Sequence, residues 1–238
     1  MGLNKAKGRM FKSVGWTWNP ITGCTHDCKY CWAKMLNDKW GKPFEPRLKG
    51  HFFKDKMPND GTWIFVGSMG DVFCNDMPVE WVGRLLNYIE AYPGNNKFLL
   101  QTKNPRAFGF WKSSLDNIKN KIILGTTIET TGETPWSKAP STVERYVYLR
   151  QMKLLGFKTF LSLEPLVDFD FNEMMKWIIE IEPEAIEIGL ENYTHFTTPP
   201  SEESILNLIH NLDVLEIPYI LKENLASLAS KELRRGEQ

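Results

Sequence analysis

Short apolar runs alternate along the chain with longer stretches in which apolar residues return every three to four positions. The short runs are rich in branched and aromatic residues, which is typical of strands buried on both faces of a parallel sheet. We therefore expect strands over Trp16–Asn19, Trp63–Gly67, Phe98–Thr102, Ile122–Ile128, Thr159–Leu163, Ala185–Gly189 and Tyr219–Leu221.

The longer stretches have the spacing of amphipathic helices. Apolar side chains three and four residues apart share one face of a helix, which can then pack against a sheet. The pattern is clearest for Trp81, Leu85, Leu86 and Ile89, for Phe171, Met174, Met175, Ile178 and Ile179, and for Ile205, Leu208, Ile209 and Leu212. Gly156 stands where a glycine would end a helix over Thr142–Leu155.

Strands that alternate with helices predict a parallel sheet with right-handed crossovers. Six or seven such units favour an α/β fold built as a full or partial (β/α) TIM-like barrel. No G-x-G-x-x-G segment follows the first strand, which argues against a dinucleotide-binding fold. We expect residues 1–15 to form an N-terminal extension and residues 16–238 to form one barrel domain.

Composition and charge narrow the class of protein. Hydrophobic residues make up 42% of the 238 residues, which is enough for a large core, and no apolar run is long enough to span a membrane. The basic N-terminus lacks the apolar segment of a secretory signal, so we expect a cytoplasmic protein. A net charge of zero gives no support to a large nucleic-acid footprint, and we interpret Lys5, Lys7, Arg9 and Lys12 as a solvated terminus.

Three of the four cysteines fall within eight residues, in the loop after the first predicted strand. Cys24, Cys28 and Cys31 have the spacing C-x₃-C-x₂-C, and neighbours this close in a cytosolic chain favour a metal centre over disulfides. Three thiolates on one loop can bind three irons of a cubane cluster and leave the fourth iron open to a ligand. Gly23 lets the backbone turn closely around such a cluster.

A zinc site is the alternative interpretation of this loop, with Cys74 or His26 as a fourth ligand. Zinc sites usually pair their cysteines in two C-x₂-C knuckles, which this chain lacks. His26 has three possible roles: ligating the metal, donating a hydrogen bond to a cluster sulfide, or capping the loop.

The pattern C-x₃-C-x-aromatic-C, with Tyr30 as the aromatic residue, resembles the signature of the radical S-adenosylmethionine (SAM) superfamily. The wider segment Trp16–Ala33 is similar to that of an uncharacterised family of phage- and prokaryote-encoded radical SAM-like proteins, and to relatives of spore photoproduct lyase. Later segments that look like the same uncharacterised family are Ser68–Asp71, Gln101–Pro105 and Ser162–Pro165.

The resemblance implies a [4Fe-4S] cluster that binds SAM through its open iron and reductively cleaves it to methionine and a 5′-deoxyadenosyl radical. It also implies polar SAM contacts at the carboxyl ends of barrel strands, where barrel enzymes place their chemistry. Asp71 would face the SAM ammonium, Lys103 its carboxylate, and Glu129 and Glu164 the ribose hydroxyls, with Ser68 and Ser162 beside them. For each of these residues an ordinary strand-end or capping role is the alternative.

Cys74 follows the second predicted strand and has two interpretations. It is either a small buried residue in a turn or, by the resemblance to photoproduct lyases, a catalytic thiol that donates hydrogen to a substrate radical. The predicted function is radical SAM chemistry on an unknown substrate, with a nucleic acid possible and an electron donor such as flavodoxin or ferredoxin. The alternative is a non-catalytic iron–sulfur or zinc-binding protein with a structural or regulatory role.

Overall fold

The computed structural model describes residues 2–194 and 196–226. Its main sheet has eight strands in the order β1-β2-β5-β6-β7-β8-β9-β10. Only β1 runs antiparallel to its neighbour, and the remaining pairs of adjacent strands are parallel. The strands are β1 (Leu3–Lys5), β2 (Val14–Trp18), β5 (Trp63–Val66), β6 (Lys97–Gln101), β7 (Ile122–Thr127), β8 (Thr159–Leu163), β9 (Ile186–Ile188) and β10 (Tyr219–Leu221).

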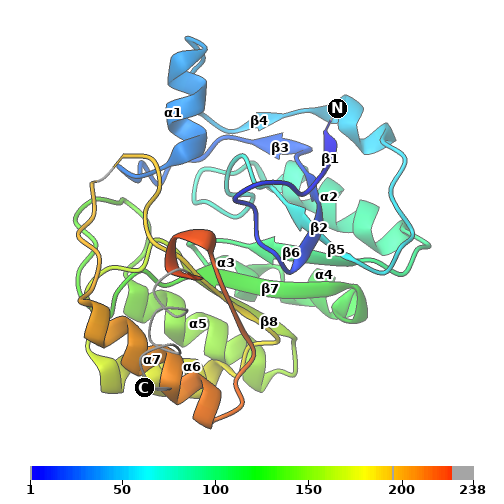
Figure 1. Cartoon of the computed structure of the whole chain (residues 1–238). Coiled ribbons are helices and arrows are strands. Elements are labelled where there is room, and N and C mark those ends of the chain that lie inside the picture. The colour runs from blue at the N-terminus through cyan, green and yellow to red at the C-terminus, as the bar shows by residue number, and fades with distance from the viewer. Residues whose placement is uncertain (1, 195, 227–238) are drawn as a thin grey trace.

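The sheet curls into a partial barrel (Figure 1). In the part of the chain that the structure describes, β1 and β10 are the two edges of the sheet and do not pair with each other. The prediction of a full or partial TIM-like barrel is therefore confirmed in its partial form. Each of the seven predicted strands is present, with its ends shifted by at most two residues.

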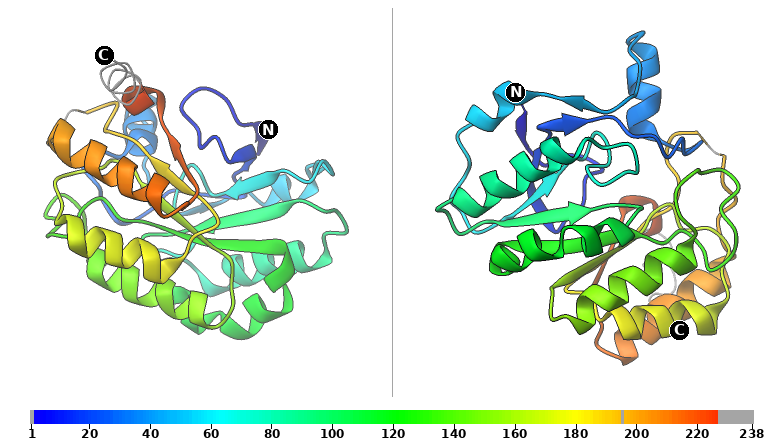
Figure 2. Two further views of the ribbon diagram at one scale, coloured as in Figure 1. Left: turned by 60° about the horizontal axis from the view of Figure 1, so that its bottom comes forward. Right: turned by 180° about the vertical axis from the view of Figure 1, so that it is seen from behind.

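Helices cover the outer face of the curled sheet (Figure 2). They are α2 (Val79–Ala91), α3 (Arg106–Phe110), α4 (Lys112–Asn117), α5 (Thr142–Leu154), α6 (Phe171–Ile181) and α7 (Glu202–Val214). The predicted apolar stripes supply most of the buried faces of these helices, but Ile179 of α6 is 53% exposed. α6 buries Met174, Met175 and Ile178, and each fully buried side chain of this size contributes about 1.5–3 kcal/mol. Asp170 caps α6 by accepting a hydrogen bond from the Glu173 amide, and Gly156 follows α5 with a φ of 80°.

A small ribbon and one short helix carry the cysteine segment. β3 (Ile21–Thr22) pairs antiparallel with β4 (Arg47–Leu48), and α1 (Trp32–Lys39) stands out from the body of the molecule between them (Figure 1). The 3₁₀ turns η1 (Gly50–Lys54) and η2 (Lys119–Lys121) are further connectors.

The side chains on the inner face of the sheet change from apolar to polar along the strands. Inward positions begin apolar, at Leu99, Ile123 and Phe160, and these three side chains share one buried cluster. Two residues further along β6 and β8, and four along β7, the inward positions are Gln101, Ser162 and Thr127, which line a cavity. Because successive side chains on a strand alternate between faces, the barrel acquires an apolar floor and a polar upper wall.

The N-terminal segment lies on this inner side, opposite the helices (Figure 2, left). Phe11 joins the apolar floor and contacts Phe65 and Phe160, with ring centroids 5.4 Å and 5.1 Å away. Ser13 donates two hydrogen bonds, from its amide and its hydroxyl, to the buried carboxylate of Glu187. The side chains of Lys5, Lys7, Arg9 and Lys12 are exposed, as the interpretation of a solvated cluster requires. The backbone that carries them is nevertheless part of the fold, because residues 3–5 form a strand and Phe11 packs inside the barrel.

Candidate functional site

A cavity of about 390 Å³ opens at the carboxyl ends of the parallel strands. A volume of this size lies within the range of small-molecule sites in proteins. Its walls come from the N-terminal segment, the cysteine loop with the start of α1, Phe44 before β4, the ends of β5 to β8, and the segments after β9 and β10. The three clustered cysteines all lie in this wall, as do Ser68, Asp71, Lys103, Ser162 and Glu164.

The cysteine loop is fixed by a close backbone approach. Gly23 has a φ of 86°, and a β-carbon at this position would lie 2.0 Å from the carbonyl oxygen of Glu45. Gly23 also forms a parallel bridge with Gly70, with its amide donating to the Met69 carbonyl at 3.0 Å. Only a glycine fits this approach, which joins the start of the loop to the end of β5.

Each cysteine sulfur of the loop takes part in a hydrogen bond with a neighbouring group. The amide of His26 donates to Cys24 Sγ, and that of Lys34 to Cys31 Sγ, both at 3.4 Å, while Cys28 Sγ lies 3.1 Å from Ser137 Oγ. Cys31 is the N-cap of α1, where the helix dipole favours a thiolate. Burial acts in the other direction and raises the pKa of the Cys31 thiol above its ordinary value.

The three cysteines fit a cluster by the chemistry of the donor set. They are free of disulfides, and their side chains share one cavity wall. Within residues 2–194 and 196–226, no three histidine, cysteine or carboxylate side chains already converge on one point as metal ligands do. Binding a metal cluster would thus require the thiols of Cys24, Cys28 and Cys31, which already line the same cavity, to move closer together.

Asp71 joins the cysteine loop to the end of β6. Its Oδ2 accepts hydrogen bonds from His26 Nε2, Thr102 Oγ1 and the Lys103 amide, each at 2.9 Å, and its Oδ1 accepts one from the Phe73 amide. Burial alone would raise the pKa of Asp71, but the hydrogen bond and charge of His26, with the two amides, hold that pKa below its usual range. Asp71 lines the cavity, yet its oxygens already hold the loop in place.

Glu129 lies behind the cavity wall and has no exposed surface. Tyr30 and Lys103 donate to its Oε1, and Arg145 donates to its Oε2 at 2.6 Å. Burial alone would raise the pKa of Glu129, but the charges of Arg145 and Lys103 lower it to about 2. The ribose contact predicted for Glu129 would need a free oxygen at the cavity, whereas this carboxylate holds two residues that do line it.

At the opposite end of the cavity, a lysine lies between two carboxylates. Lys222, after β10, places its ammonium 3.5 Å from Glu164 and 3.8 Å from the fully buried Glu187. Burial raises the pKa of the Glu164 carboxyl above its ordinary value, although the ammonium of Lys222 partly offsets this effect. Gly189 makes room for the pair, because a β-carbon there would lie 2.7 Å from Lys222 Cγ and 3.2 Å from Glu164 Cδ.

The remaining predicted residues lie as follows. Ser68 lines the cavity and donates to Asn19 Oδ1 at 3.2 Å, and Ser162 lines it while almost fully buried. Cys74 is not in the cavity wall: it belongs to the buried apolar core, where its thiol contacts Cys24. That contact, followed by burial, raises the pKa of Cys24. A direct contact of Cys74 with a substrate therefore has no support in this arrangement.

Several wall residues were not selected from the sequence. Lys7, Arg9 and Phe11 come from the segment that we expected to be solvated, and Tyr193 from the loop after β9. The alternation of basic residues with Met10 and Phe11 is a weak signal that could have indicated a partly buried segment. Lys222 was recognisable only as one polar strand end among many.

Solved structures of spore photoproduct lyase and SuiB are similar in fold, and two of them contain bound SAM. Spore photoproduct lyase, in a mutant form with bound AdoMet and dinucleoside spore photoproduct, is 16% identical, with a TM-score of 0.58 over 79% of this chain and 60% of its own. SuiB of Streptococcus suis, bound to the precursor peptide SuiA, is 11% identical, with a TM-score of 0.57 over 91% of this chain and 50% of its own. SuiB bound to SAM has a TM-score of 0.52 at 11% identity, over 86% of this chain and 46% of its own.

These likenesses establish the class of fold, a partial (β/α) barrel shared with spore photoproduct lyase and SuiB, and the chain spans about half to three fifths of the length of these structures. The chain belongs to the family described as "Protein of unknown function (DUF5131)", whose model matches residues 11–180. No curated protein matches its sequence. In the described part of the chain, no helix is long and apolar enough to cross a membrane.

Proposed function

We propose that this protein is a radical SAM enzyme whose [4Fe-4S] cluster is held by Cys24, Cys28 and Cys31. The observation that carries the proposal is that all three cysteines line one cavity at the carboxyl ends of the barrel strands. Three thiol ligands leave one iron of a cubane without a protein ligand. The likeness of the fold to SAM-binding structures supports the same conclusion.

Different residues of the cavity wall would bind different groups of SAM. Lys103, with 16% of its side chain exposed, offers an ammonium group for a carboxylate, while Ser68, Ser162 and Glu164 offer hydrogen-bonding groups for an amine or hydroxyls. When bound, the cluster would supply the electron that cleaves SAM to methionine and a 5′-deoxyadenosyl radical. Asp71 and Glu129 act indirectly, because each holds residues of the cysteine loop and the end of β6 in place.

The apolar floor has a role in this proposal. Phe11 and Phe65 line the cavity with apolar surface below the polar wall and pack together in the barrel floor. Exclusion of water protects reactive intermediates from side reactions. The electron would come from outside, from a protein donor such as flavodoxin or ferredoxin.

Anaerobic reconstitution with iron and sulfide tests the proposal. We expect about four irons per chain, visible absorbance of the cluster, and formation of 5′-deoxyadenosine from SAM after reduction with dithionite. The variant with Cys24, Cys28 and Cys31 replaced by alanine should retain neither iron nor cleavage, whereas Cys74→Ala should retain both.

A zinc protein with a structural role is the alternative outcome of the same experiment. Cys74 contacts Cys24, so a fourth thiol lies beside the loop. His26 Nε2 is hydrogen-bonded to Asp71, so a metal at this histidine would have to bind Nδ1. Zinc bound at one per chain, lost in Cys74→Ala and accompanied by no SAM cleavage, would contradict the enzyme proposal.

A further inference from the structure

The turn Lys7–Met10 places two positive charges at the mouth of the cavity. The Met10 amide donates to the Lys7 carbonyl at 3.3 Å, and Gly8 between them has a φ of 60°, which glycine adopts without strain. Lys222 donates a hydrogen bond to the Arg9 carbonyl at 2.8 Å. Phe11, the residue that follows the turn, packs in the barrel floor. The backbone that carries Lys7 and Arg9 is thus held against the cavity by Lys222 and Phe11.

The other charged groups of the cavity wall are held by ion pairs or hydrogen bonds inside the protein. Lys103 pairs with Glu129, and Lys222 pairs with Glu164. The oxygens of Asp71 accept four hydrogen bonds, and both oxygens of Glu191 accept bonds from the amides and hydroxyls of two threonines, Thr194 and Thr197.

Lys7 and Arg9 differ from these groups. Among the described residues, neither has a carboxylate within ion-pair distance, although Arg9 is near enough to Glu164 to lower the pKa of that carboxyl. In the described part of the chain, the cavity wall thus has two cationic groups without an ion-pair partner, while Asp71 and Glu191 keep their negative charge among hydrogen-bond donors. A ligand that enters past Lys7 and Arg9 meets these two cations, which favours an anionic group on the ligand.

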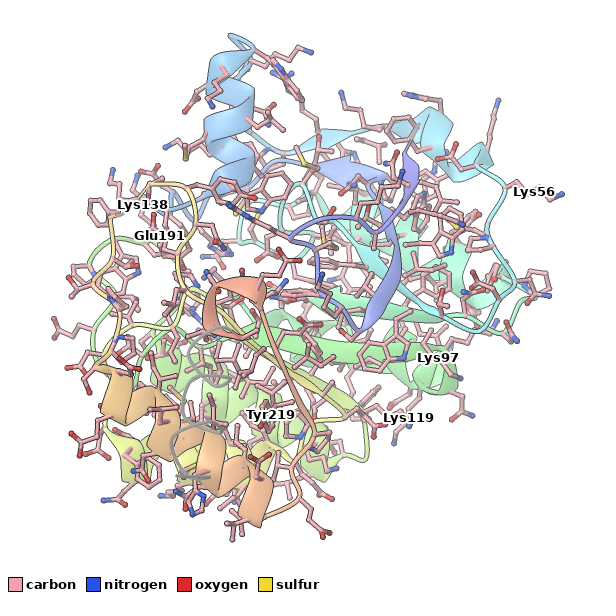
Figure 3. The ribbon with its side chains drawn as sticks, viewed as in Figure 1. Lys56, Lys97, Lys119, Lys138, Glu191 and Tyr219 are labelled. Atoms are coloured by element: carbon pink, nitrogen blue, oxygen red, sulfur yellow. The ribbon has the colours of Figure 1, made fainter. Side chains whose placement is uncertain are left out.

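Aromatic rings lie beside these cations. The Arg9 guanidinium lies 5.3 Å from the ring centroid of Tyr193, and the Tyr193 ring lies 6.5 Å from that of Trp32. Tyr193 is 45% exposed, so one part of its ring is open to solvent at the mouth. Glu191, labelled in Figure 3, marks the start of this loop beside the cavity.

We propose that the mouth, formed by Lys7, Arg9 and Tyr193, binds an unpaired nucleic-acid strand as the substrate of the proposed radical SAM activity, on which this inference rests. Lys7 and Arg9 would contact phosphates, and Tyr193 would stack on a base. Cations that follow a backbone, together with exposed aromatic rings, are the combination by which proteins bind single strands. A duplex would offer its phosphates but no open base face to the ring.

Fluorescence anisotropy with labelled strands of about 12 nucleotides tests this inference on the full chain. We expect single-stranded DNA or RNA to bind more tightly than the duplex of the same sequence. Tyr193→Ala should weaken binding about 5-fold or more, the loss associated with one stacked base. Lys7→Ala and Arg9→Ala should each make the dependence of log affinity on log salt less steep by about 0.7.

Two variants away from the mouth serve as controls. Lys56, at the far edge of the molecule in Figure 3, and Phe110, which is 74% exposed on α3, remove a similar charge and a similar ring. Lys56→Ala and Phe110→Ala should leave affinity and salt slope unchanged. Binding that Tyr193→Ala and Arg9→Ala do not change, or an acidic peptide that competes with equal affinity, would overturn the inference.

The same preparations separate the two proposals. Cleavage of SAM by the reconstituted enzyme, with no single-strand binding at the mouth, would remove this inference and leave the proposed function. Strand binding that depends on Tyr193 and Arg9, in a protein that binds no cluster, would remove the proposed function and show the nucleic-acid site by itself.

Discussion

Glu129 shows how a single buried charge can organise a site that it does not enter. A carboxylate without solvent contact is costly unless charged partners and hydrogen bonds surround it. Here Arg145 contacts one oxygen, while Lys103 and Tyr30 contact the other. Lys103 and Tyr30 line the cavity, so the cost of burying the group is offset by contacts that fix two wall residues at once.

Replacing Glu129 by glutamine should destabilise the protein by about 3–5 kcal/mol at neutral pH, because Arg145 and Lys103 would remain buried without their counter-charge. Urea unfolding of the apoprotein measures this change. Glu184→Gln, which breaks an exposed pair with Lys158, is the matched control and should cost at most about 1 kcal/mol.

The effect should also depend on pH. The pKa of Glu129 is about 2 in the folded protein and 4.5 in its ordinary state, so its ionised form contributes stability that is complete above 4.5. That contribution is lost as the pH falls toward 2, and the difference between wild type and Glu129→Gln should shrink over this interval. A difference that stays constant between pH 6 and pH 3 would show that the charge of Glu129 is not what stabilises the fold.

At the scale of elements, the cysteine loop depends on contacts with neighbouring segments more than on its own length. Its first residue, Gly23, lies against the backbone of Glu45 and bridges to Gly70. His26 reaches Asp71, and Cys31 begins α1. The spacing of the cysteines indicates a metal-binding loop, but these contacts decide that all three thiols face the same cavity.

Gly23→Ala should displace the loop, because the added carbon would lie 2.0 Å from a backbone oxygen and the φ of 86° would be strained for alanine. We expect iron retained after reconstitution to fall well below that of the wild type. Gly8→Ala is the control, since Gly8 also has a positive φ of 60° but no atom within 4 Å of an added carbon. Equal iron content in the two variants would mean that the close approach at Gly23 does not position the thiols.

At the scale of the whole molecule, the partial barrel is completed from inside by residues that precede its first parallel strand. Among the described residues, β1 and β10 do not pair with each other, so the sheet is open between them. The N-terminal segment covers the inside of the sheet through Phe11, Ser13 and the Arg9 carbonyl. The proposed division between an extension at 1–15 and a barrel at 16–238 thus concerns a segment that shares the core of the barrel.

Phe11→Ala should destabilise the protein by about 3–5 kcal/mol, since it empties a buried site between Phe65 and Phe160. Thermal or urea unfolding measures the change. Phe110→Ala, which removes a ring of the same size that is 74% exposed, should change stability by about 0.5 kcal/mol or less. Similar costs for the two substitutions would show that the N-terminal segment does not close the barrel in solution.

The sequence by itself determined the order and type of the elements, because buried strands and amphipathic helices have periods that one chain displays locally. It also indicated the cysteine loop, since the three ligands lie within eight residues. Ser68, Lys103, Ser162 and Glu164 could be placed at the cavity from their positions at strand ends alone.

The tertiary structure decided which of these groups are free. Glu129 and Asp71 are held by partners 16 to 99 positions away. Cys74 lies in the buried core beside Cys24, and Lys7 and Arg9 reach the cavity from the N-terminal segment. Such pairings depend on which strands become neighbours and which way the barrel remains open. Local sequence patterns do not show which residues distant in the chain become neighbours. Only the folded structure therefore distinguishes a side chain that faces a ligand from one that holds another residue in place.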